Sequence, residues 1–142
     1  MTNPDLVAHK ASRVSTRLVR VQSGIAVGSE AFLSRIDLIE QVAFNMFLAI
    51  QESADIASHI VTDEGWGTPA TVAEVFEFLH RNGVLSAESA NAMGRGTRLR
   101  NLIAHAYGDL DAGKLFAAAA AGVGQIERFL VEVGTWVATR TV

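Results

Sequence analysis

The sequence contains no cysteine, only two prolines and only four histidines. The lack of cysteine excludes disulfides and thiol chemistry. The histidines, at positions 9, 59, 80 and 105, are not spaced like the ligands of a metal site. We therefore expect neither a metal ion nor another cofactor.

Long hydrophobic runs are also missing. No apolar stretch reaches the ~18 residues that a membrane-spanning helix needs, and the N-terminal MTNPDLVAHKASR lacks the apolar run of a signal peptide. These absences predict a cytoplasmic protein that does not associate with a membrane. The net charge of −3 excludes a surface that is basic all over, but it is compatible with a local basic patch.

What the chain does contain is helical periodicity. Of its 142 residues, 49% are hydrophobic, which is enough for one domain over residues 1–142 with a sizeable core. Apolar positions recur at spacings of three and four, and strand-like alternation is missing. We predict an all-α protein, an antiparallel bundle of four to five helices. The expected helices cover about residues 5–22, 29–62, 68–83, 86–107 and 112–138.

Capping signals set the helix starts. Ser29 and Ser86 are expected to cap the second and fourth helices. The third helix is expected to begin at Pro69, where a missing N–H costs nothing. A capping box formed by Thr71 and Glu74 is the alternative start.

Glycines fall within and after the fourth predicted helix. Gly94 and Gly96 are each expected to weaken its middle by ~1 kcal/mol relative to alanine, which leaves room for a kink or a break. Gly108 is the expected C-terminal stop.

Four polar residues share one face of the second predicted helix: Asn45, Glu52, Asp55 and His59. One interpretation is a solvated stripe. The other is a polar wall that lines a cleft, with Glu52, Asp55 and His59 as the candidate cleft residues. The spacing leaves both interpretations open.

The densest polar cluster is RNLIAHAY, residues 100–107. On a helix, Arg100 and Tyr107 lie on one face, whereas Asn101 and His105 lie on another, roughly 100–140° away. A long arginine side chain can still sweep towards His105. Both groups can therefore reach one phosphate, although nothing in the spacing forces them to.

These groups suit the cleavage of RNA without a metal. A histidine takes or gives a proton near neutral pH, and the arginine fork stabilises charge that develops on a phosphate. Asn101 can orient the histidine or the phosphate, and the 2′-hydroxyl of RNA supplies the nucleophile. The alternative is a polar helix end without a catalytic role, because a histidine near a helix C-terminus is favourable through the helix dipole alone.

RNLIAHAY also resembles the Arg-x4-His-x-Tyr motif of the HepT-like toxins, a family within the HEPN superfamily of helical ribonucleases. AIQESADIASHIV is similar to the second core helix of that family, and TPATVAEVFEFLHRNGVLS is similar to its next segment. The order and the gaps agree from about residue 39 to residue 110, roughly half of the chain.

The resemblance implies a helical bundle that forms homodimers, with two motifs meeting at a cleft along the interface. It implies a metal-independent endoribonuclease, the toxin of a toxin–antitoxin pair, with transfer RNA as one plausible substrate. By position, Arg100 and His105 would be catalytic and Asn101 supporting. The antitoxin would be a nucleotidyltransferase of the MNT type, which in some systems adds AMP to the motif tyrosine, here Tyr107.

Basic residues extend this expectation. Two arginines, Arg95 and Arg98, precede the motif. Four more basic residues fall within about 80° of arc on the first predicted helix: Lys10, Arg13, Arg17 and Arg20. We expect Arg13 and Arg17 to bind RNA phosphates together with the two arginines near the motif. An ordinary solvated face is the alternative for the first helix.

The chain has more large apolar residues than one small core needs, which predicts a dimer interface. The residues that carry this prediction are Phe32, Phe44, Phe47, Phe129 and Trp136. Two alternatives to a toxin are a HEPN module that only dimerises and binds a nucleotidyltransferase, and a helical interaction protein with an accidental motif. The intact motif argues against the first, and the wider resemblance argues against the second.

Overall fold

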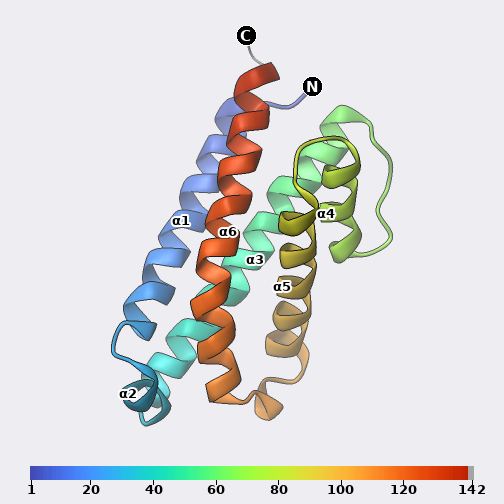
Figure 1. Ribbon diagram of the computed structural model, residues 1–142. Coiled ribbons are helices and arrows are strands. Elements are labelled where there is room, and N and C mark those ends of the chain that lie inside the picture. Colours follow the sequence, from blue (N-terminus) through green and yellow to red (C-terminus); the bar gives the residue numbers. More distant parts are fainter. Residues whose placement is uncertain (141–142) are drawn as a thin grey trace.

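The computed structural model describes residues 1–140, and every regular element within them is helical. The elements are α1 (Pro4–Ile25), α2 (Ser29–Leu33), α3 (Ile36–Glu64), α4 (Val72–Arg81), α5 (Ala87–His105), the 3-10 turn η1 (Tyr107–Asp109) and α6 (Ala112–Arg140). The predicted all-α antiparallel bundle is confirmed (Figure 1). Within the described residues, no helix combines the length and hydrophobicity that crossing a lipid bilayer requires.

The central helix of the bundle is α3, which packs against α1, α2, α4, α5 and α6. In Figure 1, α1 lies on one side of α3, and α4 and α5 lie on the other. The apolar positions of α3 recur at three and four residues, and they bury Met46 and Ile50. Phe76 and Phe129 extend this core from α4 to α6, with their ring centroids 5.6 Å apart.

The start of α3 differs from the prediction. Ser29 does not cap the long helix but begins the short helix α2, and α3 starts at Ile36. Gly28 precedes α2 with a φ of 90°, a conformation that glycine adopts at little cost. The extra helix buries Phe32 against Phe116 of α6, with 5.2 Å between the ring centroids. This contact depends on α6, so the local pattern did not reveal it.

Capping chemistry decides where α4 and α5 begin. The helix α4 begins at Val72 and not at Pro69, and Thr71 caps it: the Thr71 hydroxyl accepts a hydrogen bond from the Glu74 N–H at 3.2 Å. The alternative start is therefore the right one. Ser86 caps α5 as predicted, because its hydroxyl accepts a hydrogen bond from the Ser89 N–H at 3.1 Å.

The course of α5 corrects two predictions about glycine. The helix runs without a break through Gly94 and Gly96, because packing against α3 and α6 outweighs their weak helix propensity. It ends at His105, and Gly108 lies inside η1 rather than at the helix end. Ala106 leaves the helical conformation, with φ −142° and ψ 38°, as the chain reverses to enter α6.

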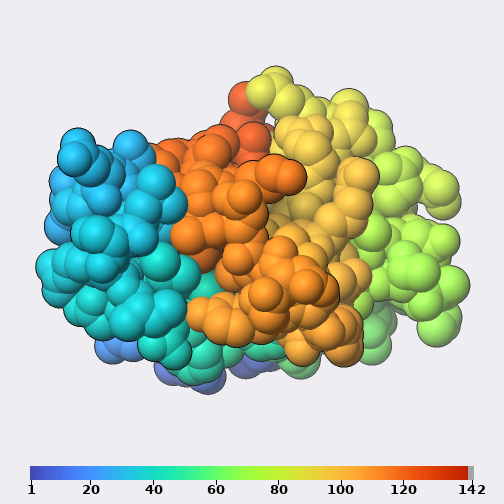
Figure 2. All heavy atoms as spheres, turned by 90° about the horizontal axis from the view of Figure 1, so that it is seen from below, coloured from blue at the N-terminus to red at the C-terminus, as the bar shows by residue number. Residues whose placement is uncertain are grey.

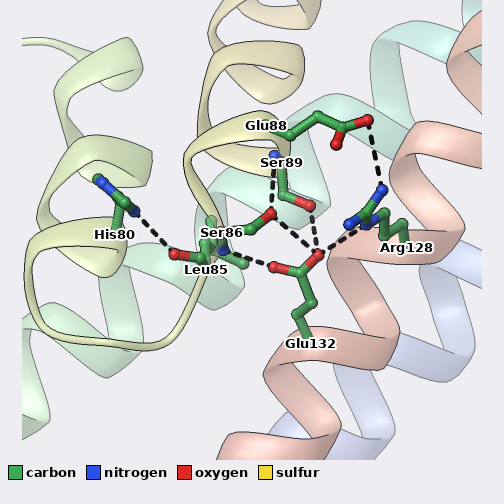
Figure 3. A network of polar contacts seen from close by, with 7 residues as sticks. All are labelled: His80, Leu85, Ser86, Glu88, Ser89, Arg128 and Glu132. Atoms are coloured by element: carbon green, nitrogen blue, oxygen red, sulfur yellow. Dashed lines mark hydrogen bonds and ion pairs between the residues drawn. The ribbon is translucent and has the colours of Figure 1, made fainter.

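A polar network joins the N-terminal end of α5 to α6 (Figure 3). Glu132 of α6 accepts hydrogen bonds from the Ser86 N–H at 2.7 Å and from the Ser89 hydroxyl at 2.5 Å. Arg128 donates to the same carboxylate at 3.1 Å. Burial alone would raise the pKa of Glu132, but these hydrogen bonds outweigh burial and hold its pKa below the usual value.

Candidate active site

The four motif residues occupy the C-terminal end of α5 and the turn that follows. Arg100 and Asn101 lie in the last two turns of α5, and His105 is its last residue. Tyr107 is the first residue of η1. The change from α-helix to 3-10 turn therefore falls between the histidine and the tyrosine.

The side chain of Arg100 turns towards α3. Its Nη1 donates a hydrogen bond to the Gln51 side-chain oxygen at 2.5 Å. Its Nη2 donates to the Asn101 side-chain oxygen, also at 2.5 Å. The Nε atom is buried and has no hydrogen-bond acceptor within residues 1–140. The guanidinium is thus held in place by two uncharged acceptors.

His105 and Tyr107 are exposed, and neither side chain makes a hydrogen bond or an ion pair within residues 1–140. Tyr107 is 42% exposed. Figure 2 shows the end of the bundle that carries η1: the turn and the start of α6, in orange, lie at the surface between α2 and α5. Both side chains are open to a ligand or a partner.

Arg100 and His105 form no hydrogen bond with each other in the described chain. Arg100 is held against α3, whereas His105 faces solvent at the end of α5. The structure therefore does not by itself bring the two side chains together, and movement of the arginine or a contribution from a second chain would do so.

The polar residues of α3 divide into two groups. Glu52, which is only 14% exposed, faces α1 and pairs with Arg17 at 3.5 Å and with Arg13 at 3.8 Å. Asp55 is exposed and accepts a hydrogen bond from the Gln51 side-chain amide at 3.4 Å. Asp55 is therefore linked to Arg100 through the side chain of Gln51, whereas Glu52 belongs to the packing of α1 against α3.

The other two residues of that polar line form no hydrogen bond with Arg100 in the described chain. Asn45 is buried, and its side-chain amide donates to the Gln41 carbonyl at 2.8 Å. His59 is partly buried and makes no hydrogen bond or ion pair within residues 1–140.

The basic residues lie on two surfaces. Arg95 and Arg98 are exposed on α5, and neither forms an ion pair within the described residues. On α1, Lys10 and Arg13 line a small hollow of about 60 Å³ together with Glu52 and Asp55. The carboxylates offset much of the positive charge of that hollow, so the α5 arginines are the freer of the two groups.

Two further apolar surface features lie on α3, α5 and α6. An apolar groove of about 220 Å³ between α3, α5 and α6 includes Leu99 and Arg95 in its lining. Phe44 of α3 and Leu102 of α5 are exposed, at 58% and 38%. These apolar side chains are not covered by the described chain.

Three of the residues that predicted a dimer interface belong to the core instead. Phe32 and Phe129 are fully buried, and Trp136 packs edge-on against Trp66 with ring centroids 5.6 Å apart. The prediction is wrong for these three residues, because contacts between helices bury Phe32 and Phe129 and partly bury Trp136. Phe44 is exposed, and it keeps its place in the prediction.

Sequence reasoning missed Gln51. The spacing of four to Asp55 places both on one face of α3, but nothing local links Gln51 to Arg100, 49 residues further on. The packing of α5 against α3 creates the contact.

Comparison with known proteins identifies the family. A family model described as Ribonuclease HepT-like matches residues 14–133, most of the chain. The chain belongs to the HepT-like ribonuclease family. This agrees with the resemblance carried by RNLIAHAY and the segments before it.

A named relative of this HepT-like protein agrees with the family model. A protein of Shewanella oneidensis named mRNA nuclease HepT is 24% identical over 107 residues, which cover 75% of this chain and 80% of that protein.

Two solved structures share the fold. A toxin–antitoxin with AMP-PNP has a TM-score of 0.86 at 21% identity and covers 92% of this chain and 98% of that chain. A tri-AMPylated HEPN toxin of Shewanella oneidensis in complex with MNT antitoxin has a TM-score of 0.85 at 21% identity, with 95% and 99% covered.

Proposed function

We propose that this HepT-like protein is the toxin of a toxin–antitoxin pair and acts as a metal-independent endoribonuclease in the cytoplasm. The observation that carries the proposal is the state of the motif within a HepT-like chain: Arg100 is held in place, while His105 and Tyr107 are exposed and have no partner within residues 1–140. A helix end with only a structural role has no need of both a fixed arginine and an exposed histidine that is unpaired within residues 1–140.

The chemistry requires few groups because RNA carries its own nucleophile. The 2′-oxygen attacks the neighbouring phosphorus, and the bond from phosphorus to the 5′-oxygen breaks. His105 either accepts the proton of the 2′-hydroxyl as a general base or donates a proton to the leaving 5′-oxygen as a general acid. Arg100 stabilises the negative charge that develops on the phosphate oxygens. Asn101, which accepts from Arg100, supports the arginine.

A homodimer would complete this site. Within one chain Arg100 turns towards α3 and His105 faces solvent, so a second copy that places its own motif across a shared groove can bring the two groups to one phosphate. The exposed Leu102, within the motif, and the exposed Phe44 of α3 supply apolar surface for such an interface. A sedimentation mass equal to one chain at micromolar concentration would contradict the dimer.

RNA binding would rely mainly on the basic residues of α5. Arg95 and Arg98 are exposed and unpaired within the described chain, and Arg13 and Arg17 contribute less because they share Glu52. The relative named mRNA nuclease HepT makes messenger RNA a candidate substrate class beside transfer RNA. RNA affinity that falls only slowly with added salt would argue against these phosphate contacts.

The antitoxin would be a nucleotidyltransferase of the MNT type that modifies Tyr107. The exposed hydroxyl can attack the α-phosphate of ATP, so that AMP is transferred to its oxygen and pyrophosphate leaves. The similar structures support this partner, because one is a tri-AMPylated HEPN toxin with MNT antitoxin and another is a toxin–antitoxin with AMP-PNP. An AMP group on Tyr107 would place bulk and negative charge close to His105.

Induction in cells that lack the partner tests the proposal. We expect the wild type to arrest growth and to fragment RNA, and His105→Ala to do neither. If both chains are equally harmless, the protein is a non-catalytic module that binds a nucleotidyltransferase. If both are equally toxic, the motif is not the source of the harm. Mass spectrometry after co-expression with the partner is expected to find AMP on the wild type and none on Tyr107→Phe.

A further inference from the structure

The guanidinium of Arg100 depends on a residue outside the motif. Only one of its two held nitrogens bonds within α5, the one that donates to Asn101. The other donates to Gln51 of α3 at 2.5 Å. Its Nε is buried and has no acceptor within residues 1–140. A buried donor without an acceptor costs free energy, so other contacts must hold the group in place.

The contact of the Gln51 amide nitrogen with Asp55 explains why the amide oxygen points towards Arg100. The amide nitrogen donates to Asp55 at 3.4 Å, one helical turn further along α3. A carboxylate accepts hydrogen bonds only, and a guanidinium donates them only. With Asp55 on one side and Arg100 on the other, the amide satisfies both neighbours in only one orientation, with its oxygen towards the arginine.

An amide at this position differs from a carboxylate in charge. A glutamate in place of Gln51 would form an ion pair with Arg100 and would offset the charge that must face a phosphate. The neutral oxygen of Gln51 fixes the guanidinium and leaves its charge in place. The carboxylate of Asp55 bonds to the other end of the amide, so the amide of Gln51 lies between it and the arginine.

We propose that Gln51 is a positioning residue for Arg100, which it holds towards the reacting phosphate as an uncharged acceptor oriented by Asp55. This inference rests on the ribonuclease function proposed above. Gln51 acts through the arginine and needs no contact with RNA.

Two substitutions at Gln51 separate geometry from charge. Gln51→Met keeps the length of the side chain but removes both hydrogen bonds. We expect it to lower the maximal single-turnover rate on a fluorescently labelled mRNA transcript by about 10- to 100-fold, since small misplacement of a catalytic group has effects of this size. Gln51→Glu keeps an acceptor for Arg100 but adds a charge. We expect it mainly to raise the RNA concentration needed for half-maximal rate.

Gln41→Met is the matched control. Gln41 is also a partly buried glutamine of α3, and its amide donates to the Arg20 carbonyl at 3.0 Å, away from Arg100. We expect this variant to cleave the transcript at the wild-type rate. Thermal unfolding of all four proteins identifies any loss of activity that comes from a loss of folding.

A readout independent of activity is the NMR signal of the Arg100 Nε–H. We expect slow hydrogen exchange in the wild type and in Gln41→Met, and fast exchange in Gln51→Met. If Gln51→Met cleaves RNA as well as Gln41→Met does, the positioning role is wrong and the ribonuclease function stands. If the wild type itself cuts no RNA, the proposed function has failed and the positioning role falls with it, whatever the exchange rates are.

Discussion

The polar groups at the two ends of α5 differ in whether they have hydrogen-bond partners. At the N-terminal end, Ser86 and Ser89 donate to a single carboxylate, Glu132, which also receives Arg128 (Figure 3). At the C-terminal end, His105 faces solvent with no partner within residues 1–140, and Arg100 keeps a buried nitrogen without an acceptor.

This difference separates stability from chemistry along one helix. Polar groups that satisfy one another hold α5 to α6 and are not available to a ligand. Polar groups that the fold leaves unpaired add little to stability, but they remain free for a substrate. Functional sites are where such departures from local satisfaction are expected. The comparison predicts that changes at the two ends will have separable effects.

The largest expected effect is on RNA cleavage, and it comes from His105 at the C-terminal end of α5. His105→Ala should reduce cleavage of an mRNA transcript by about 10²- to 10⁴-fold, the usual contribution of a general acid or base. The thermal midpoint should not change, because the side chain is exposed and unpaired within the described chain.

His80 is the matched control for that variant. Its Nδ1 lies 2.9 Å from the Leu85 carbonyl oxygen, in the connection that leads into α5 (Figure 3). His80→Ala should lower the free energy of unfolding by about 0.5–1.5 kcal/mol and leave cleavage unchanged. If His105→Ala cleaves the transcript at the wild-type rate, His105 is not a catalytic residue.

The next largest effect is on the free energy of unfolding, and it is expected at the N-terminal end of α5, where Glu132 accepts its hydrogen bonds. Glu132→Ala removes the acceptor for two serines and one arginine, and we expect it to lower the free energy of unfolding by about 2–4 kcal/mol. Chemical denaturation measures the loss. Cleavage at temperatures well below the unfolding midpoint should match the wild type. Glu40→Ala, at an exposed position of α3, is the control and should stay within about 0.5 kcal/mol.

A smaller effect on the free energy of unfolding is expected from pH. It comes from carboxylates whose hydrogen bonds are made within the fold, Glu132 and Glu64. Hydrogen bonds hold the pKa of Glu132 below its usual value of 4.5 although burial opposes them. The pKa of Glu64 is lowered in the same way, with burial opposed by hydrogen bonds from Thr2 and by the charge of Arg140. Because the folded state binds these protons less readily than the unfolded chain, their contribution is complete above the usual value and is lost as the pH falls through the lowered pKa.

Denaturation measured from neutral pH downwards checks this direction. The free energy of unfolding of the wild type should fall as the pH drops below the usual glutamate pKa of 4.5. Glu132→Gln cannot titrate at this position, so its free energy of unfolding should fall less steeply. An equal slope in both proteins would show that Glu132 is not a source of the dependence.

The smallest expected effect concerns the middle of α5, between the two ends. A methyl group at Gly94 would meet open space, so Gly94→Ala should raise the free energy of unfolding by about 0.5–1 kcal/mol through helix propensity alone. Cleavage should not change. Gly24→Ala is the contrasting variant, because its added carbon would stand 2.5 Å from the Val42 side chain. It should destabilise the protein.

Local signals predicted some boundaries and missed others. Ser86 and the box of Thr71 with Glu74 were recognisable because a cap bonds to a backbone N–H only three residues away. The short helix at Ser29 was missed, because the burial of Phe32 depends on α6. The continuity of α5 through its glycines was missed for the same reason.

By itself, the sequence determined the helical period, the all-α class, several caps and a motif typical of HepT-like ribonucleases. All of these depend on residues that are close together in the chain. Only the tertiary structure decided which faces of the helices meet. It brought Gln51 to Arg100, turned Glu52 towards α1 and left His105 and Tyr107 exposed. The physical reason is that burial of the core selects contacts between residues far apart in the chain, and no local spacing encodes them.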